Sequence, residues 1–261
     1  MPPPRIASLV PSVTELLIAI GLGPLMVART GFCIHPADAV RAIPKIGGTK
    51  DVNLAKLRRL APTHVIVNVD ENRLETVQVI RAFNPAPEIV VTHPLGPEDN
   101  LALVAQLVVQ FGAVEGVGAC ADVLTQALRH ELALTVPLGR PPQHVLYLIW
   151  REPWMTVARD TYLSRMLARV NWQTLPDLLG GASGGARYPV LRGDEPWLAD
   201  VQQVLLSSEP YAFGPSHLVQ AQALCPNAQV RCVDGELLSW YGVRAVAGLR
   251  YLRKLAALRP A

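Results

Sequence analysis

The stretch RIASLVPSVTELLIAIGL, residues 5–22, indicates how the chain begins to fold. Residues 5–10 form a short apolar run that ends at Pro11, and because proline cannot continue a strand ladder we expect a buried strand there. Ser12 and Glu15 have the spacing of a capping box, which predicts a helix that Gly21 or Gly23 ends. Strand, turn and helix in this order are typical of an α/β protein.

The same alternation continues outward from this stretch. After it we expect strands at residues 25–30, 64–68, 88–92, 144–150, 204–207 and 229–232. We expect helices at residues 54–60, 73–83, 161–170, 215–224 and 243–258, with Asn53 as the cap of the first of these. Short apolar strands that alternate with helices predict parallel sheets with both faces covered.

The middle of the chain lacks strand signals and has helical periodicity instead, with expected helices at 100–111 and 118–134. A helix of ~20 residues is ~30 Å long and can join two lobes. We therefore expect an α/β fold of two lobes, each with a mostly parallel central sheet, joined by a single long backbone helix. The expected parts are an N-terminal lobe at 1–97, a helical segment at 98–140 and a C-terminal lobe at 141–261.

Composition excludes several classes of protein. Half of the 261 residues are apolar, which argues against disorder, and the formal net charge is only +3, without the dense basic run that nucleic-acid binding requires. Residues 1–5 lead directly into a strand, and the apolar segment 16–28 is short and interrupted, so we expect neither an export signal nor a membrane span. We expect a monomer. The sequence does not decide whether Cys225 and Cys232 form a disulfide.

The motifs of common enzymes and metal sites are not found in the sequence: it has no Walker loop, no HExxH and no pair of CxxC motifs. His35, His93 and His217 fall in expected loops and are weak metal candidates. One hypothesis is therefore a metal-dependent enzyme that uses His35, His93 and Asp234, with Cys33 as a ligand or nucleophile. We expect a binding protein with no catalytic residue and no covalent cofactor.

Aromatic residues give the stronger signal, because many fall at expected strand ends and turns, where ligands bind in parallel α/β sheets. They are Phe32, Trp150, Trp154, Tyr188, Tyr211, Phe213, Trp240 and Tyr241. Such side chains suit a large, flat, partly apolar ligand.

Taken in order, several segments resemble the cobalamin- and iron-chelate-binding class of ABC-transporter substrate-binding proteins, and among these the vitamin B12-binding branch, also called helical-backbone metal receptors. They are residues 5–22, FCIHP (32–36), IPKIGGTKDVNLAKLRRLAPTHVIV (43–67), IWREPWMTVARDTYLSRML (149–167), RYPVL (187–191), LLSSEPYAF (205–213) and DGELLSWYG (234–242). The resemblance spans essentially the whole chain. It implies the two-lobed fold with a helical backbone, and a cobalamin or related metal chelate held between the lobes for ABC-type uptake.

The resemblance also implies particular residues. The ligand-binding positions would be Ser12, Phe32, Lys50, Trp150, Trp154, Tyr188, Trp240, Tyr241 and Arg244, with Arg151 flanking the aromatic set. Glu75 and Glu209 would dock on a membrane permease. The family pattern has an aromatic residue where this chain has Asn68. The family is exported, which implies a periplasmic location. A cytoplasmic corrinoid- or tetrapyrrole-binding protein for storage, delivery or sensing is the alternative.

Overall fold

The strands of the chain form two four-stranded sheets within the residues that the computed structural model describes, which are 2–137, 139 and 141–258. The sheet orders are β2-β1-β3-β4 and β6-β5-β7-β8, and every neighbouring pair is parallel. This confirms the expected α/β fold with parallel sheets. Because successive strands of a parallel sheet need a crossover, helices separate them in the sequence.

Clustering of contacts divides the chain into two compact units. The first unit comprises residues 1–94, 101–126 and 241–243, and the second comprises 95–100, 127–240 and 244–261. The chain passes from one unit to the other at residues 94/95, 100/101, 126/127, 240/241 and 243/244, and the crossing at 126/127 lies within the long helix expected at 118–134. The three-part division expected at residues 97 and 140 stays a prediction, and residue 140 lies outside the described residues.

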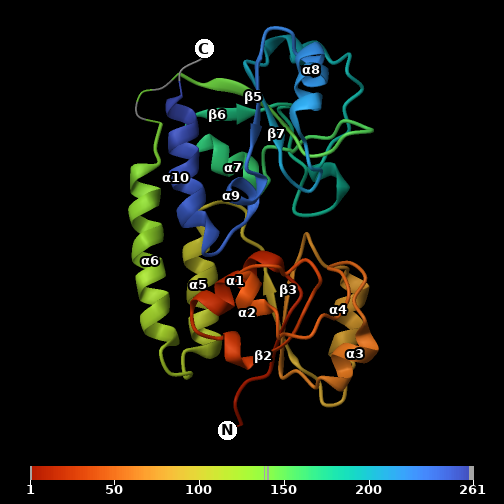
Figure 1. The fold of residues 1–261 in the computed structure, drawn as a ribbon, viewed down its shortest axis with the longest axis vertical. Helices are drawn as coiled ribbons and strands as arrows, with labels where there is room; N and C mark the ends of the chain where they lie inside the picture. The colour runs from red at the N-terminus through yellow and green to blue at the C-terminus, as the bar shows by residue number, and fades with distance from the viewer. Residues whose placement is uncertain (1, 138, 140, 259–261) are drawn as a thin grey trace. The chain divides into compact units, whose positions relative to one another are not determined.

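The first unit contains the first sheet, with α3 and α4 on one side of it and α1 and α5 on the other (Figure 1). Its elements are β1 (Ile6–Ser8), α1 (Pro11–Ala19), η1 (Gly23–Leu25), β2 (Met26–Arg29), α2 (Ala37–Val40), α3 (Leu54–Arg59), β3 (His64–Asn68), α4 (Leu74–Arg81) and β4 (Glu88–Thr92). The helices α5 (Asp99–Phe111) and α6 (Val117–Leu134) follow and extend into the second unit's residues.

The second unit contains the second sheet, with α8 on one side and α7, α9 and α10 on the other (Figure 1). Its elements are β5 (Gln143–Leu148), α7 (Tyr162–Ala168), β6 (Trp172–Thr174), η2 (Gly185–Arg187), η3 (Pro196–Asp200), β7 (Gln203–Ser207), α8 (Pro215–Leu224), β8 (Gln229–Val233), α9 (Gly235–Ser239) and α10 (Arg244–Ala257). β6 and α9 were not expected from the sequence.

Each sheet is buried on both faces by apolar side chains. In the first unit, Ala7, Val65 and Val67 from the strands pack with helix residues such as Leu57 and Ile80. In the second unit the corresponding core is built around Leu146, Val204, Leu206 and Phe213, among others. Strands buried on both faces read as continuous apolar runs, which is why the sequence indicates them clearly.

The expected capping box at Ser12 is wrong. α1 begins two residues earlier, with Pro11 as its first residue and Val10 as the N-cap, and no side chain caps it. Proline is favoured at the first helical position because its missing N–H needs no partner there and its φ is already helical. Ser12 therefore lies inside the first turn, buried, while Thr14 bonds back to the carbonyl of Val10.

The other helix ends agree with the sequence. Gly21, at φ +90°, follows the end of α1, and the Asn53 side chain accepts from the backbone N–H of Lys56 at 2.9 Å as the cap of α3. Cys225 and Cys232, both described residues, are free thiols, as are Cys33 and Cys120. Among the described residues, none of the helices combines the length and the apolar character that crossing a membrane requires.

Candidate functional site

The carboxyl ends of parallel strands meet at one edge of a sheet, and this edge is where α/β proteins bind ligands. In both units the loops that follow the strands carry the polar and aromatic side chains described below. Each unit is described by itself.

A buried arginine shapes the loop that follows β2 in the first unit. The Arg29 guanidinium donates to the carbonyls of Val40 at 2.9 Å, Cys33 at 3.0 Å and Thr30 at 3.2 Å. These bonds tie both ends of the loop to the end of the strand. The loop in turn presents Phe32, which keeps 63% of its surface exposed. An aromatic side chain held this far out by a fixed loop is available to a ligand.

The glycine turn that follows lies against Phe32. A Cβ on Gly48 would come within 3.4 Å of the Phe32 ring, and a Cβ on Gly47, at φ +94°, would come within 2.3 Å of the Asp51 carbonyl oxygen. Only glycine fits this turn without strain. Lys50, in the same turn, is exposed.

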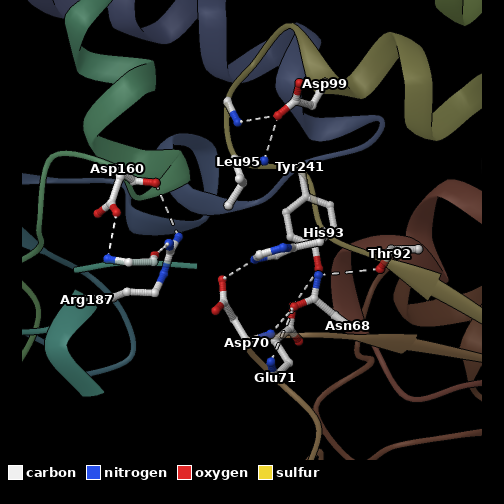
Figure 2. A network of polar contacts seen from close by, with 12 residues as sticks. Asn68, Asp70, Glu71, Thr92, His93, Leu95, Asp99, Asp160, Arg187 and Tyr241 are labelled. Atoms are coloured by element: carbon white, nitrogen blue, oxygen red, sulfur yellow. Dashed lines mark hydrogen bonds and ion pairs between the residues drawn. The ribbon is translucent and has the colours of Figure 1, made fainter. Parts of the chain in front are cut away.

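Asn68 ends β3 and fixes the loop after it (Figure 2). Its Oδ1 accepts from the backbone N–H of Asp70 at 2.8 Å and of Glu71 at 3.3 Å, and its Nδ2 donates to Thr92 at 3.4 Å. The side chain is buried. Asn68 thus has a structural role at the position where the B12-binding pattern has an aromatic residue, and it sets two carboxylates at the strand end.

Those carboxylates each have a partner within the first unit (Figure 2). His93, directly after β4, places Nε2 3.3 Å from Asp70 Oδ2. The Tyr241 hydroxyl donates to Glu71 Oε1 at 2.7 Å. Burial is the main cause that raises the pKa of Tyr241 well above its ordinary value, and the negative charge of Glu71 raises it further. The Ser12 hydroxyl beside it lowers the pKa, but by less.

An aromatic cluster lies at the strand ends of the second unit. Trp150, after β5, meets Tyr211, after β7, edge to face at 5.6 Å between ring centroids. Tyr211 continues to Phe213 at 4.7 Å, and Phe213 stacks on Trp154 at 5.9 Å. Trp150 is 41% exposed, so part of the cluster stays accessible. We call these four residues the aromatic cluster.

Trp240, which follows α9, contacts Glu209 in the loop after β7. Glu209 accepts from the Trp240 indole at 2.7 Å and from Ser239 at 2.8 Å, and burial raises the pKa of its carboxyl. The Arg244 guanidinium lies 4.8 Å over the Trp240 ring and pairs with Glu236 at 2.7 Å. Trp240 is therefore fixed at its nitrogen and on one face.

The glycine-rich loop after β6 is anchored by a buried arginine (Figure 2). Arg187 is almost fully buried and donates to the Gly181 carbonyl at 2.7 Å. Asp160 accepts the N–H groups of Gly180 and Gly181 at 2.9 and 2.8 Å. Burial alone would raise the pKa of Asp160, but these amides and the charge of Arg187 outweigh it and hold the pKa below its ordinary range. Tyr188 follows this anchor directly.

The strand-end arginines of the second unit have acidic partners. The pairs are Arg151 with Glu152 at 3.6 Å, Arg159 with Asp177 at 2.9 Å and Arg244 with Glu236 at 2.7 Å. Arg151 also lies 4.5 Å over the Trp154 ring. Their charge is largely neutralised within the unit, so this edge is not strongly basic.

The expected metal set does not assemble. In the described part of the chain, no three His, Cys, Asp or Glu side chains are grouped so that they could hold a metal ion, and His35, His93 and His217 are therefore not brought together. The Asp234 side chain caps α9 by accepting from Leu237 at 3.0 Å. Cys33 is fully buried, and burial raises the pKa of its thiol, which disfavours the thiolate that a nucleophile needs.

The structure brings some of the expected ligand-binding residues together and not others. Trp150 and Trp154 share the aromatic cluster, whereas Trp240 and Arg244 form a separate pair, and Tyr241 is buried. Of the expected docking residues, Glu75 is exposed on α4, and Glu209 is half-buried with its carboxylate engaged. Binding and docking roles for all of them stay predictions.

Sequence reasoning missed Asp70 and Glu71 as site residues, although they directly follow the expected strand 64–68, and this position was the available signal. No local feature of the sequence indicated that Asp160 and Arg187 lie close together.

No family model matches the chain. A curated relative, the uncharacterized ABC transporter substrate-binding lipoprotein YvrC of Bacillus subtilis (strain 168), is 25% identical over 171 residues, which are 63% of this chain and 53% of that protein. The chain thus spans about half the length of the curated relative it matches.

Solved structures match over nearly the whole chain. The periplasmic vitamin B12-binding protein BtuF of Vibrio cholerae superposes with a TM-score of 0.77 at 20% identity, over 98% of this chain and 99% of that one. The periplasmic haem-binding protein HutB of Vibrio cholerae gives 0.77 at 19% identity, over 98% and 100%. The chain has the fold of the class III substrate-binding proteins of ABC transporters. In this class III fold, the aromatic cluster and the loop fixed by Asn68 both lie at strand ends.

Proposed function

We propose that the chain is the substrate-binding component of an ABC-type uptake system and that its ligand is a metal chelate with a broad apolar face, a corrinoid before haem or a ferric siderophore. The aromatic cluster at the strand ends of the second unit carries this proposal, because Trp150 is partly exposed there beside Tyr211. The fold supports the transport role, since solved proteins of this fold are named as binding vitamin B12 or haem.

The charges at the strand ends support the choice of a corrinoid. Haem carries two carboxylates and many siderophores are anionic, so both need unpaired cations, whereas the strand-end arginines Arg151, Arg159 and Arg244 have acidic partners. In the first unit, Asp70 and Glu71 add negative charge. A corrinoid is largely neutral, and its side-chain amide N–H groups can donate hydrogen bonds to carboxylates. The strand-end groups of each unit, taken by itself, therefore suit amide-bearing ligands better than anionic ones.

A substrate-binding component of this kind binds its ligand and releases it chemically unchanged. Dispersion and desolvation on the aromatic faces supply most of the affinity, at ~25 cal/mol per Å² of apolar surface buried, and the polar groups orient the macrocycle. A permease on the extracytoplasmic face of the membrane would receive the loaded protein, with the exposed Glu75 on α4 as one docking contact.

The test is a titration of the purified protein with cyanocobalamin, haemin and a ferric siderophore, followed by tryptophan fluorescence and by the ligand's visible spectrum. We expect saturation at micromolar or lower concentration by cyanocobalamin, and weaker binding of the anionic chelates. Trp150→Ala should weaken corrinoid binding by about tenfold, which corresponds to ~1.4 kcal/mol. Val109→Ala, on the exposed surface of α5, is the control. Tight binding of haemin alone would overturn the choice of ligand, and no binding in the whole panel would overturn the proposal.

A further inference from the structure

His217 lies between the N-terminus of α8 and the aromatic cluster. Its Nδ1 accepts from the backbone N–H of Gly214 at 3.0 Å, so the side chain caps the helix in which it lies. Its Nε2 lies 3.2 Å from the Tyr211 hydroxyl. The ring also packs edge to face against Tyr211 and Phe213, each at 5.4 Å between centroids.

These two contacts require one tautomer of the neutral ring. Because a backbone N–H can only donate, Nδ1 must carry a lone pair, and the single proton of the neutral imidazole then resides on Nε2. Nε2 donates it to the oxygen of Tyr211. The neutral ring thus satisfies the Gly214 amide and orients Tyr211 at the same time.

Protonation of His217 is incompatible with this arrangement. The second proton would be placed on Nδ1, where it would face the Gly214 N–H across 3.0 Å, so two donors would oppose each other. The positive end of the α8 dipole also disfavours a cation in the first turn. The aromatic rings around the imidazolium would attract it, but they cannot replace the lost acceptor.

The charged groups of the surrounding elements do not offset this effect. α8 has no charged residue besides His217 itself. On the loop after β5, Arg151 donates to Gln220 of α8 and pairs with Glu152. On β8, the Arg231 guanidinium binds Gln203 and Gln229. The nearest carboxylate along the loop after β7, that of Glu209, is engaged by Ser239 and Trp240, and the group facing the ring is the Tyr211 hydroxyl.

We propose that His217 is a pH-sensitive positioning residue that holds Tyr211, and through it Trp150, in the arrangement of the aromatic cluster at neutral pH and releases them when the ring is protonated. Tyr211 supports Trp150 by the edge-to-face contact at 5.6 Å. Histidine is the side chain that ordinarily changes charge between pH 5 and 8, and protonation here removes the acceptor that the Gly214 N–H uses. Where the cluster binds the ligand, acid weakens binding, and this consequence rests on the proposed function.

The first experiment needs no ligand. In the free protein, ¹⁵N NMR of the imidazole at pH 7.5 should show Nε2 protonated and Nδ1 unprotonated for His217. On acidification, the indole N–H signal of Trp150 should shift with the same midpoint as the His217 ring. A proton on Nδ1 at pH 7.5, or a Trp150 signal that does not change as His217 titrates, would overturn the inference. This outcome is independent of whether any chelate binds.

Two substitutions separate the acceptor from the titration. His217→Gln keeps an acceptor for the Gly214 amide but cannot titrate, so the Trp150 signal should become insensitive to pH between 7.5 and 5. His217→Ala lacks the acceptor at every pH, so its Trp150 signal at pH 7.5 should match that of the native protein at pH 5. His130→Gln, on the exposed surface of α6, should keep the native pH response.

The second experiment measures affinity for cyanocobalamin at pH 7.5 and 5. We expect a loss of about tenfold for the native protein and for His130→Gln, and a change within about twofold for His217→Gln. An equal loss in His217→Gln would overturn the role of His217 in binding. If cyanocobalamin does not bind at all, the proposed function fails while the NMR result still decides the inference.

Discussion

The Tyr241 hydroxyl donates to Glu71 Oε1 at 2.7 Å and so joins two residues that are 170 positions apart in the sequence, both within the first unit. Tyr241 is buried, and Gly242 after it lies at φ +75°, where an added Cβ would come within 3.2 Å of Leu16. A segment from near the end of the chain thus completes the region around α1.

Tyr241→Phe removes this hydrogen bond and should lower the free energy of unfolding by ~1.5–3 kcal/mol at pH 7, because the Glu71 carboxylate loses its donor. The pKa of Tyr241 is raised in the folded state, so its contribution is fully present below the ordinary tyrosine pKa of about 10 and is lost as the pH rises above it. Urea unfolding at pH 7, 9 and 11 should therefore show a smaller loss of stability with pH in the variant than in the native protein. A parallel decline in both proteins would contradict this role.

Glu131 on α6 accepts from Arg250 at 2.6 Å and from Arg253 at 2.5 Å, and its side chain is only 3% exposed. Burial alone would raise the pKa of Glu131, but the two arginines outweigh it and lower the pKa. Its contribution to stability is therefore present above the ordinary glutamate pKa of about 4.3 and is lost as the pH falls through the folded-state value.

Glu131→Gln should accordingly destabilise the protein by ~1–3 kcal/mol at pH 7 and by much less at pH 3. Urea midpoints at the two pH values measure this. Glu115→Gln, at an exposed position between α5 and α6, should change neither midpoint. An equal loss at both pH values would mean that packing, not charge, explains the effect.

Phe32→Ala should separate binding from stability. Because the ring is mostly exposed, the free energy of unfolding should change by less than ~0.5 kcal/mol. Loss of its apolar surface from the bound state should weaken corrinoid binding by about fivefold, or ~1 kcal/mol. Calorimetric titration and thermal unfolding of the same sample check both. A large drop in stability without a change in affinity would assign Phe32 to the fold instead.

Asn68→Ala leaves the amides of Asp70 and Glu71 without their acceptor and should cost ~1–3 kcal/mol. Hydrogen exchange at residues 69–72 should accelerate. Thr92→Val removes the 3.4 Å bond from Asn68 Nδ2 and keeps the Oδ1 acceptor in place, so exchange at residues 69–72 should accelerate much less. If the two variants behaved alike, the loop would not depend on the Oδ1 acceptor.

Gly180→Ala should disrupt the anchor of the glycine-rich loop, because the new Cβ would lie 2.4 Å from the Arg187 Cα and the backbone must move. We expect a loss of at least ~2 kcal/mol. Gly185→Ala is the matched control in the same loop, since its Cβ would meet nothing within 4 Å, and it should be nearly neutral. Thermal unfolding compares them, and equal stabilities would argue against the close packing at Gly180.

Much of the fold was predictable because it depends on local patterns. The strands His64–Asn68 and Glu88–Thr92 and the helix Pro215–Leu224 have the bounds expected from the sequence. Buried parallel strands are uninterrupted apolar runs, and Pro215 marks a helix start. β6, with the sequence WQT, has a single apolar residue and therefore gives no apolar run.

The candidate site was less predictable because it depends on contacts between distant residues. Aromatic residues in loops indicated Trp150 and Trp154, but the bond from Tyr241 to Glu71 has no local signature. The capping spacing at Ser12 was misleading because Pro11 is the better helix start. The sequence did not indicate that Asn68 fixes the loop after it, because its bonds to the N–H groups of Asp70 and Glu71 are seen only in the structure.

The first unit is discontinuous in the sequence, since residues 241–243 belong to it although the preceding and following residues belong to the second unit. During synthesis, Ser12, Leu16 and Glu71 therefore leave the ribosome long before Tyr241 and Gly242, which cover them. The N-terminal part of the nascent chain cannot reach its final packing until residues 241–243 have been translated. A chain that stops at residue 240 would leave this region of α1 and the Glu71 carboxylate uncovered, so late truncations should be as damaging to the first unit as to the second.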